Sequence, residues 1–253
     1  VFYGGATWTQ PPAGTARAPD RLFEGDAASG RFGFSVASAG DVNGDGYADL
    51  VIGALYASPD GRGQAGTASV FHGSATWTQP PAGTVRTPDR LLEGLVASGQ
   101  FGSAVASAGD VNGDGYADII VGIYDGNGSA HVYHGSASGL TATAATSLAG
   151  RDGMDSYFGL SVASAGDVNG DGYSDVIVGA FGANNRTGAA YVYLGSVSGV
   201  STAPATSLVG SDGTGMHFGG SVASAGDVNG DGYSDVIVGA FGANNRTGAA
   251  YLY

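Results

Sequence analysis

The sequence predicts an all-β protein, a β-propeller whose four repeats stack as blades around an axis. Three observations predict it: 48 of the 253 residues are Gly, an acidic nine-residue string recurs four times, and short strand-like segments recur around it. Abundant Gly disfavours long helices and favours tight turns, and a recurring segment of this length indicates a repeat architecture. With 43% hydrophobic residues the chain can build a core, and we predict one domain over residues 1–253.

The repeats are defined by the string Asp-Val-Asn-Gly-Asp-Gly-Tyr, then Ala or Ser, then Asp. Copies begin at Asp41, Asp110, Asp167 and Asp227, so their spacings are 69, 57 and 60 residues by subtraction. A Phe-Gly pair precedes each copy, and an apolar run ending in Gly follows it. The repeats are expected to cover approximately residues 20–73, 89–135, 146–195 and 206–253.

Each repeat is predicted to contribute four strands. The first, residues 221–225 in the last repeat, has only small residues besides Val222, which suits the narrow centre of a propeller. The second, residues 236–238, is apolar without alternation, so both of its faces must be covered. The third, Ala189–Tyr193, is rich in aromatic residues, and a fourth is expected near Thr206–Val209. Blades stacked around an axis satisfy these demands, although a linear β-solenoid also fits the periodicity.

The two ends of the chain bear on ring closure. The last repeat stops after its third strand at Tyr253, and residues 21–23 are a candidate for the missing fourth strand. An N-terminal strand that completes the last blade would close a four-blade ring and remove exposed edges. Residues 1–3, however, match residues 70–72 and duplicate a third-strand position. This duplication favours a segment of a longer array, or half of a larger ring formed by strand exchange or dimerisation.

The acidic string has the composition of a calcium-binding loop. Side-chain oxygens stand at positions 1, 3, 5 and 9, Gly stands at positions 4 and 6, and the carbonyl of Tyr at position 7 is a further donor. Ca²⁺ takes 6 to 8 oxygen ligands at about 2.3–2.6 Å, whereas Mg²⁺ requires stricter octahedral geometry. The loops contain no His or Cys, which disfavours zinc and copper. The predicted Ca²⁺ ligands, with one site per repeat, are Asp41, Asn43, Asp45, Tyr47, Asp49, Asp110, Asn112, Asp114, Tyr116, Asp118, Asp167, Asn169, Asp171, Tyr173, Asp175, Asp227, Asn229, Asp231, Tyr233 and Asp235.

The distribution of charge supports a metal role. The four loops hold twelve of the 22 acidic residues, and four Ca²⁺ would change the formal charge from −13 to −5. The competing interpretation is that Asn-Gly-Asp-Gly forms ordinary hairpin turns with solvated carboxylates. Four repetitions of all nine positions favour the metal, and we expect the ions to stabilise the fold rather than to perform catalysis.

The Phe-Gly pair, the acidic loop and the run Ile52-Gly53-Ala54-Leu55 together resemble the FG-GAP repeat. This repeat occurs in integrin α-subunit propellers and in bacterial exported proteins. The resemblance implies a β-propeller with Ca²⁺ bound on one face, in the hairpin between the first and second strands of each blade. It also implies an extracellular or cell-surface location. Integrin propellers have seven blades, whereas this chain has four repeats.

Composition narrows the partners. A net charge of −13 opposes binding to nucleic acid, and no apolar run reaches the ~20 residues that a membrane span needs. We therefore expect the protein to bind no nucleic acid and not to insert into a membrane. The expected partners are a protein or glycan ligand and a second copy of the chain in a homodimer.

The leading functional hypothesis is a non-enzymatic, calcium-binding scaffold for adhesion or ligand binding. Catalysis needs an asymmetric cluster of residues, whereas the acids here recur in every repeat. The alternatives are a lectin-like propeller that uses Trp8 and Trp77, or the propeller of a polysaccharide-acting enzyme or phospholipase. For the two Trp, packing against their own blades is the favoured interpretation.

Overall fold

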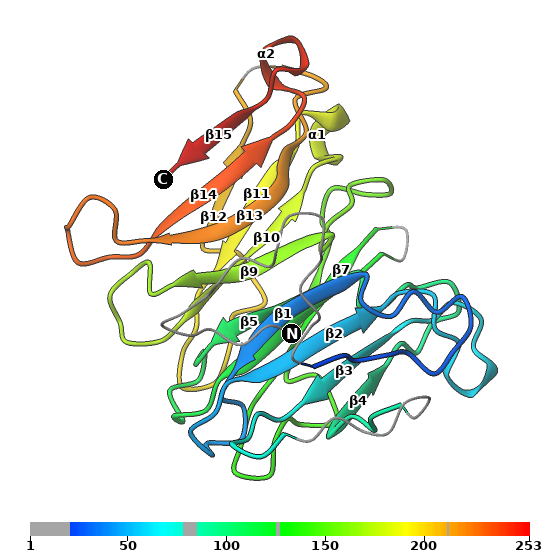
Figure 1. Cartoon of the computed structure of the whole chain (residues 1–253). Helices are drawn as coiled ribbons and strands as arrows, with labels where there is room; N and C mark the ends of the chain where they lie inside the picture. Colours follow the sequence, from blue (N-terminus) through cyan, green and yellow to red (C-terminus); the bar gives the residue numbers. More distant parts are fainter. Residues whose placement is uncertain (1–20, 78–84, 125–126, 212) are drawn as a thin grey trace, which may run out of the picture.

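A computed structural model describes residues 21–77, 85–124, 127–211 and 213–253. They form four antiparallel sheets arranged one after another (Figure 1). The sheets contain β1 (Ser35–Gly40), β2 (Asp49–Ala54), β3 (Thr67–Phe71) and β4 (Arg90–Glu93); β5 (Ala104–Gly109), β6 (Asp118–Ile123), β7 (Ser129–Tyr133) and β8 (Thr146–Ala149); β9 (Ser161–Gly166), β10 (Asp175–Ala180), β11 (Ala189–Tyr193) and β12 (Thr206–Val209); and β13 (Phe218–Gly226), β14 (Asp235–Ala240) and β15 (Ala249–Leu252). The predicted all-β propeller architecture is confirmed.

Three short turns of helix complete the secondary structure of the residues that the structure describes. They are the 3-10 turn η1 (Pro59–Gly61), α1 (Ala183–Arg186) and α2 (Ala243–Arg246). Asn184 and Asn185 of α1 have φ angles of 51° and 57°, in the left-handed region that Asn tolerates better than most residues. The Asn-Asn pairs therefore act as turn residues between the second and third strands.

The strand order places the small-residue strands innermost. Each sheet begins with its first strand at one edge, and β1 lies against β5, β5 against β9, and β9 against β13. Ala39, Ala108 and Ala165 on three of these strands are fully buried. Their small side chains allow the inner strands to approach closely, as the narrow centre of the row requires.

The core lies between consecutive sheets. Val51, Ile120 and Ile177 occupy the same position of the second strand in the first three blades, and each is fully buried against the following blade. The neighbouring residues of each second strand face the preceding blade, as Val121 and Val178 do. This double burial explains why the run is apolar without alternation.

The Phe-Gly pairs join one blade to the next. Phe101, Phe158 and Phe218 form isolated parallel bridges with Gly66, Gly128 and Gly188 of the preceding blade. Their rings lie edge-on to Tyr133, Tyr193 and Tyr253 of their own blades, at centroid distances of 6.3–6.4 Å. All three Phe are at most 2% exposed, so an equivalent aromatic side chain is buried at each of these blade–blade junctions.

The last sheet has three strands in the described part of the chain, and Arg21–Phe23 do not complete it. These residues lie on the first blade instead. The ring of Phe23 packs 4.8 Å from that of Phe71 and 5.5 Å from that of Trp77, and Arg21 Nε donates to the Trp77 carbonyl at 2.9 Å. The Phe23 ring is partly buried against Phe71 and Trp77, and this packing explains why residues 21–23 lie on the first blade. Residues 1–3 and Trp8 lie outside the described residues.

The first and last blades form the two ends of an open row among the described residues (Figure 1). Val36 on the first blade is 66% exposed, and Leu252 on the last is 54% exposed, although their counterparts inside the row are buried. The described residues therefore do not form a closed ring of four blades.

Candidate metal centre

Each acidic loop connects the first and second strands of its sheet. Because all sheets have the same strand order, the four loops lie at the same edge, as the β9–β10 and β13–β14 connections in Figure 1 show. The predicted ligands are thus brought to one face of the molecule. The short helices α1 and α2 connect second to third strands and lie at the opposite edge.

The first Asp of each loop organises the turn. In the second blade, Asp110 Oδ1 accepts hydrogen bonds from the backbone of Gly113 at 2.7 Å and Asp114 at 3.1 Å. Its other oxygen accepts from Gly115 at 2.8 Å. Gly113 and Gly115 have φ angles of 72° and 89°, which a side chain would make costly. The same three bonds recur in the other loops, at 2.7–3.1 Å.

Positions 3 and 5 hold each other in place. Asn112 Oδ1 accepts from the Asp114 backbone at 3.1 Å, and its Nδ2 donates to Asp114 Oδ2 at 2.9 Å. In the first loop, the amide of Asn43 and the backbone N–H of Tyr47 lower the pKa of Asp45, because both favour the ionised form. In the last loop Asn229 Nδ2 points elsewhere, to Asp235 at 3.4 Å.

The Asp at position 9 is buried beneath the loop. Asp118 accepts from the backbone of Val111 and of Gly135, both at 2.8 Å, so it ties the loop to the end of the third strand. Burial raises the pKa of Asp118 to about 7 and also raises the pKa values of Asp49 and Asp175. A buried carboxylate without a cationic partner is costly, and a nearby cation would offset that cost.

The donor chemistry fits a hard cation. The Tyr carbonyls at position 7 accept no hydrogen bond from any described residue, which leaves them available as ligands. No Arg or His forms an ion pair with a loop carboxylate within the described ranges. The loops do not present a preassembled metal group, however, since no cluster of three or more His, Cys, Asp or Glu suited to a metal occurs among the described residues.

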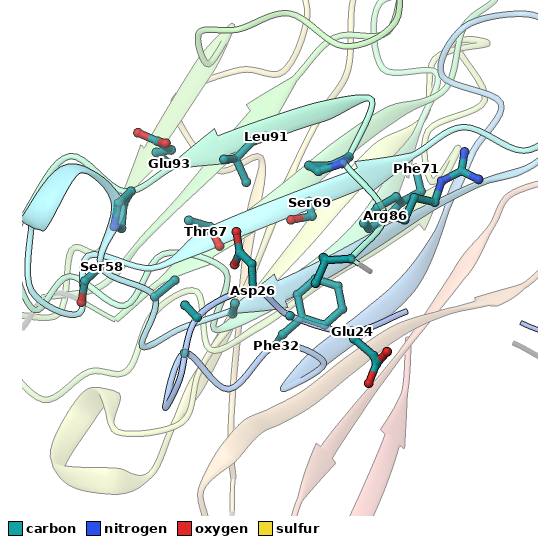
Figure 2. A pocket seen from close by; sticks show the side chains of 18 residues that line it. Glu24, Asp26, Phe32, Ser58, Thr67, Ser69, Phe71, Arg86, Leu91 and Glu93 are labelled. Carbon is teal, nitrogen blue, oxygen red and sulfur yellow. The ribbon is translucent and has the colours of Figure 1, made fainter. Parts of the chain in front are cut away.

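A cavity of about 330 Å³ on the first blade is a separate candidate for ligand binding. Figure 2 shows Phe32 and Phe71 along one part of it, and Asp26 beside Thr67 and Ser69. It combines aromatic surface with hydroxyl and carboxylate groups, which is the mixture found in pockets for small polar molecules.

Trp77 is not part of an open binding surface. It is 9% exposed, packs against Phe23, and donates from Nε1 to the His72 carbonyl at 2.5 Å. The predicted packing role is confirmed for Trp77, which removes one of the two Trp from the lectin hypothesis.

An aromatic row that the repeat pattern did not predict lies at the edge opposite the acidic loops. Tyr157 stacks between Tyr124 and Phe181, at centroid distances of 5.4 and 4.4 Å, and His217 stacks on Phe241 at 4.6 Å. Phe241 is 60% exposed. Tyr157 and His217 each precede a Phe-Gly pair, and the other three follow second strands. The recurrence of aromatic residues at these two places of the repeat could have predicted the row from the sequence.

Comparison with known proteins agrees with the repeat pattern. The FG-GAP repeat matches residues 32–71 and 218–253, and the FG-GAP-like repeat matches residues 110–178. Integrin alpha-5 of Xenopus laevis is 37% identical over 171 residues, which cover 63% of this chain and 16% of that protein.

Two further relatives show the same extent of similarity. Mouse integrin alpha-IIb is 39% identical over 173 residues, covering 66% of this chain and 16% of its own length. Human integrin alpha-6 is 36% identical over 164 residues, covering 64% of this chain and 13% of its own length. The chain thus spans about one sixth or less of these relatives. By its repeats and its relatives, the chain belongs to the FG-GAP repeat family and is homologous to the integrin α-subunits.

Proposed function

We propose that the chain is a calcium-stabilised, non-enzymatic propeller segment of an exported or cell-surface protein, which presents a ligand-binding surface. The observation that carries the proposal is the fourfold repetition of one loop geometry. In every copy the first Asp accepts three backbone N–H groups from positions 4, 5 and 6, and its carboxylate, an Asn and a second Asp meet in one turn.

The ion would neutralise the loops. Positions 1, 3, 5 and 9 and the position 7 carbonyl would hold Ca²⁺ in each repeat, and the bound charge would relieve repulsion among the three carboxylates. Extracellular proteins commonly use sites with Kd values of about 10⁻⁴–10⁻³ M, because Ca²⁺ is abundant there. An extracellular location would supply enough Ca²⁺ to fill sites of this affinity. Within the described residues, no helix is long and apolar enough to cross a membrane.

Calorimetric titration of the metal-free protein with CaCl₂ tests the metal. We expect about four sites, and loss of one site in each variant Asp114→Asn and Asp171→Asn. These substitutions keep the side-chain volume and one oxygen, so the turn is retained while a charged ligand is lost. Asp26→Asn is the matched control outside the loops and should bind as the unaltered chain does. Absence of heat and of any bound Ca²⁺ in a native mass spectrum would refute the metal assignment.

The aromatic row supports the binding role. Phe241 is 60% exposed and stacks on His217 at 4.6 Å, and aromatic ring faces of this kind suit aliphatic, cationic or sugar ligands. The lectin alternative has one supporting observation, the cavity lined by Phe32, Phe71 and Asp26. A glycan array with the Phe241→Ala and Ser69→Trp variants separates the two surfaces, since the second substitution fills the cavity and leaves the aromatic row intact.

A further inference from the structure

The junction between the first and second blades contains a cavity of about 470 Å³. Phe101, Ile123 and Tyr133 line it, and each of these residues is at most 9% exposed. Leu95 and Val96 also line it, but they are 82% and 58% exposed, so they lie where the cavity opens to solvent. Cavities of about 300–1,000 Å³ with a mainly apolar lining are typical binding sites for small molecules.

At the next junction, between the second and third blades, polar side chains bridge the same place. Counted from the glycine after the fourth strand, Arg151 and Asp152 occupy the positions that Leu95 and Val96 have at the first junction. The Arg151 side chain donates from Nη2 to a backbone carbonyl of the third blade at 3.2 Å. The hydroxyl of Tyr191 donates to Asp152 Oδ2 at 2.5 Å. These two hydrogen bonds connect the second blade to the third.

The first junction lacks the side chains that form these bonds. His131 also lines the cavity, and it stands where the third blade has Tyr191, because each is the middle residue of its third strand. Leu95 and Val96 have no polar side-chain atom that could replace a guanidinium or a carboxylate. The cavity therefore lies where the sequence departs from the following repeat at three neighbouring positions.

The hydroxyl of Tyr133 supplies a polar group to this apolar lining. Tyr133 is 5% exposed, and its hydroxyl forms no hydrogen bond with any residue that the structure describes. Burial raises the pKa of Tyr133 to about 12, so the hydroxyl remains protonated at neutral pH. A buried hydroxyl without a partner is costly, and a ligand that forms a hydrogen bond with it would offset that cost.

The charges around the cavity favour a neutral ligand. Glu93 lines the cavity, and its carboxylate forms an ion pair with Arg62 at 2.7 Å, so this charge already has a partner. The net charge of −13 repels anions. An ion would therefore lose its hydration on entering without gaining an unpaired counter-charge from Glu93.

We propose that this cavity binds a small neutral molecule with an apolar ring body and one hydrogen-bonding group. The ring body packs against Phe101 and Ile123, and the polar group forms a hydrogen bond with the Tyr133 hydroxyl. Among the described residues, those that line the cavity include none from the acidic loops and none from the aromatic row. The site is thus additional to the proposed function and does not require calcium.

Calorimetric titration with 2-naphthol, which is neutral at pH 7, tests the site at one fixed CaCl₂ concentration. We expect one molecule bound per chain, and binding of the anion 2-naphthoate that is weaker by about tenfold or more. Tyr133→Phe should weaken 2-naphthol binding about fivefold, because one hydrogen bond is lost. Phe71 occupies the equivalent position of the first blade, so the fold accommodates this substitution. Unchanged affinity in Tyr133→Phe contradicts the role of the hydroxyl.

A double substitution closes the cavity. His131→Tyr combined with Val96→Asp copies the Tyr191–Asp152 pair of the next junction, so this variant should keep its circular dichroism spectrum and bind no 2-naphthol. Val197→Asp is the matched control, because Val197 is 80% exposed and lies outside the cavity, and it should bind as the unaltered chain does.

Three results overturn the proposal. Absence of binding to the unaltered chain would mean that the cavity is only a packing gap between two blades. Binding retained by the double variant would place the probe elsewhere on the protein. An equal loss of binding in Val197→Asp would show that the effect of Val96→Asp comes from added negative charge rather than from closure of the cavity.

Discussion

A β-carbon placed on Gly179 would lie 2.1 Å from the carbonyl oxygen of Gly219, so the third and fourth blades are in direct backbone contact there. The contact partner is backbone, which cannot rotate away as a side chain can. Packing between the blades, rather than turn geometry, therefore requires a glycine at position 179.

Gly179→Ala should accordingly destabilise the protein strongly, by about 1–3 kcal/mol or more, because the methyl group forces the two blades apart. Gly239→Ala is the matched control, since the nearest atom to its β-carbon would be the Ser221 hydroxyl oxygen at 2.2 Å, which can rotate away, and its other close neighbours, also in Ser221, would lie at 3.6 and 3.7 Å. Urea unfolding measures both. Equal losses in the two variants would show that the junction tolerates the methyl group.

Asp175 should stabilise the fold even without metal. It accepts hydrogen bonds from the backbone of Val168 and Gly195, both at 2.8 Å, and it is fully buried. Asp175→Ala leaves two N–H groups without a partner, at about 1–3 kcal/mol each. Urea unfolding in excess chelator should reveal this loss, whereas Asp26→Ala, at an exposed position, should change little. No loss in chelator would mean that Asp175 matters only through a bound ion.

Chelation should lower the melting temperature. An ion bound only to the folded state stabilises it by about 1.4 kcal/mol per site when its concentration is about tenfold above Kd. Differential scanning calorimetry in chelator and in CaCl₂ measures the difference. This difference in melting temperature should decrease stepwise as Asp45→Asn, Asp114→Asn, Asp171→Asn and Asp231→Asn are combined. The control substitution Asp26→Asn should leave the difference unchanged. A melting curve that chelator leaves unchanged would contradict structural calcium.

Trp77 should report a buried environment. In a Trp8→Phe variant, all Trp fluorescence comes from Trp77, which packs against Phe23 and is 9% exposed. We expect blue-shifted emission that acrylamide quenches weakly, and red-shifted, readily quenched emission after unfolding in urea. Readily quenched emission from the folded variant would return Trp77 to the candidate sugar-binding surface.

Local chemistry explains why so much of the fold was predictable. The runs around Val222, Ile237 and Tyr191 each became the predicted strand, because each apolar or small-residue segment is bounded by Gly, Asn or Asp. The turn at Asp110 follows from neighbours within five residues in sequence, so its hydrogen bonds need no distant partner.

Contacts between residues that are distant in the sequence were harder to predict. The stack of Tyr124, Tyr157 and Phe181 forms only when adjacent blades meet, and no single repeat contains it. Likewise the placement of Phe23 on the first blade depends on Phe71 and Trp77, which are about fifty residues away in sequence.

By itself, then, the sequence determined the repeat, the strands of each blade and the oxygen-rich loops, because short-range spacing and side-chain chemistry define all three. Only the tertiary structure decided that the blades form an open row, that Asp118 and its equivalents are buried supports of the loop, and that Ile237 is left exposed. The physical reason is that burial depends on what covers a residue. Identical repeats have identical local sequence, and only their neighbours distinguish an internal blade from a terminal one.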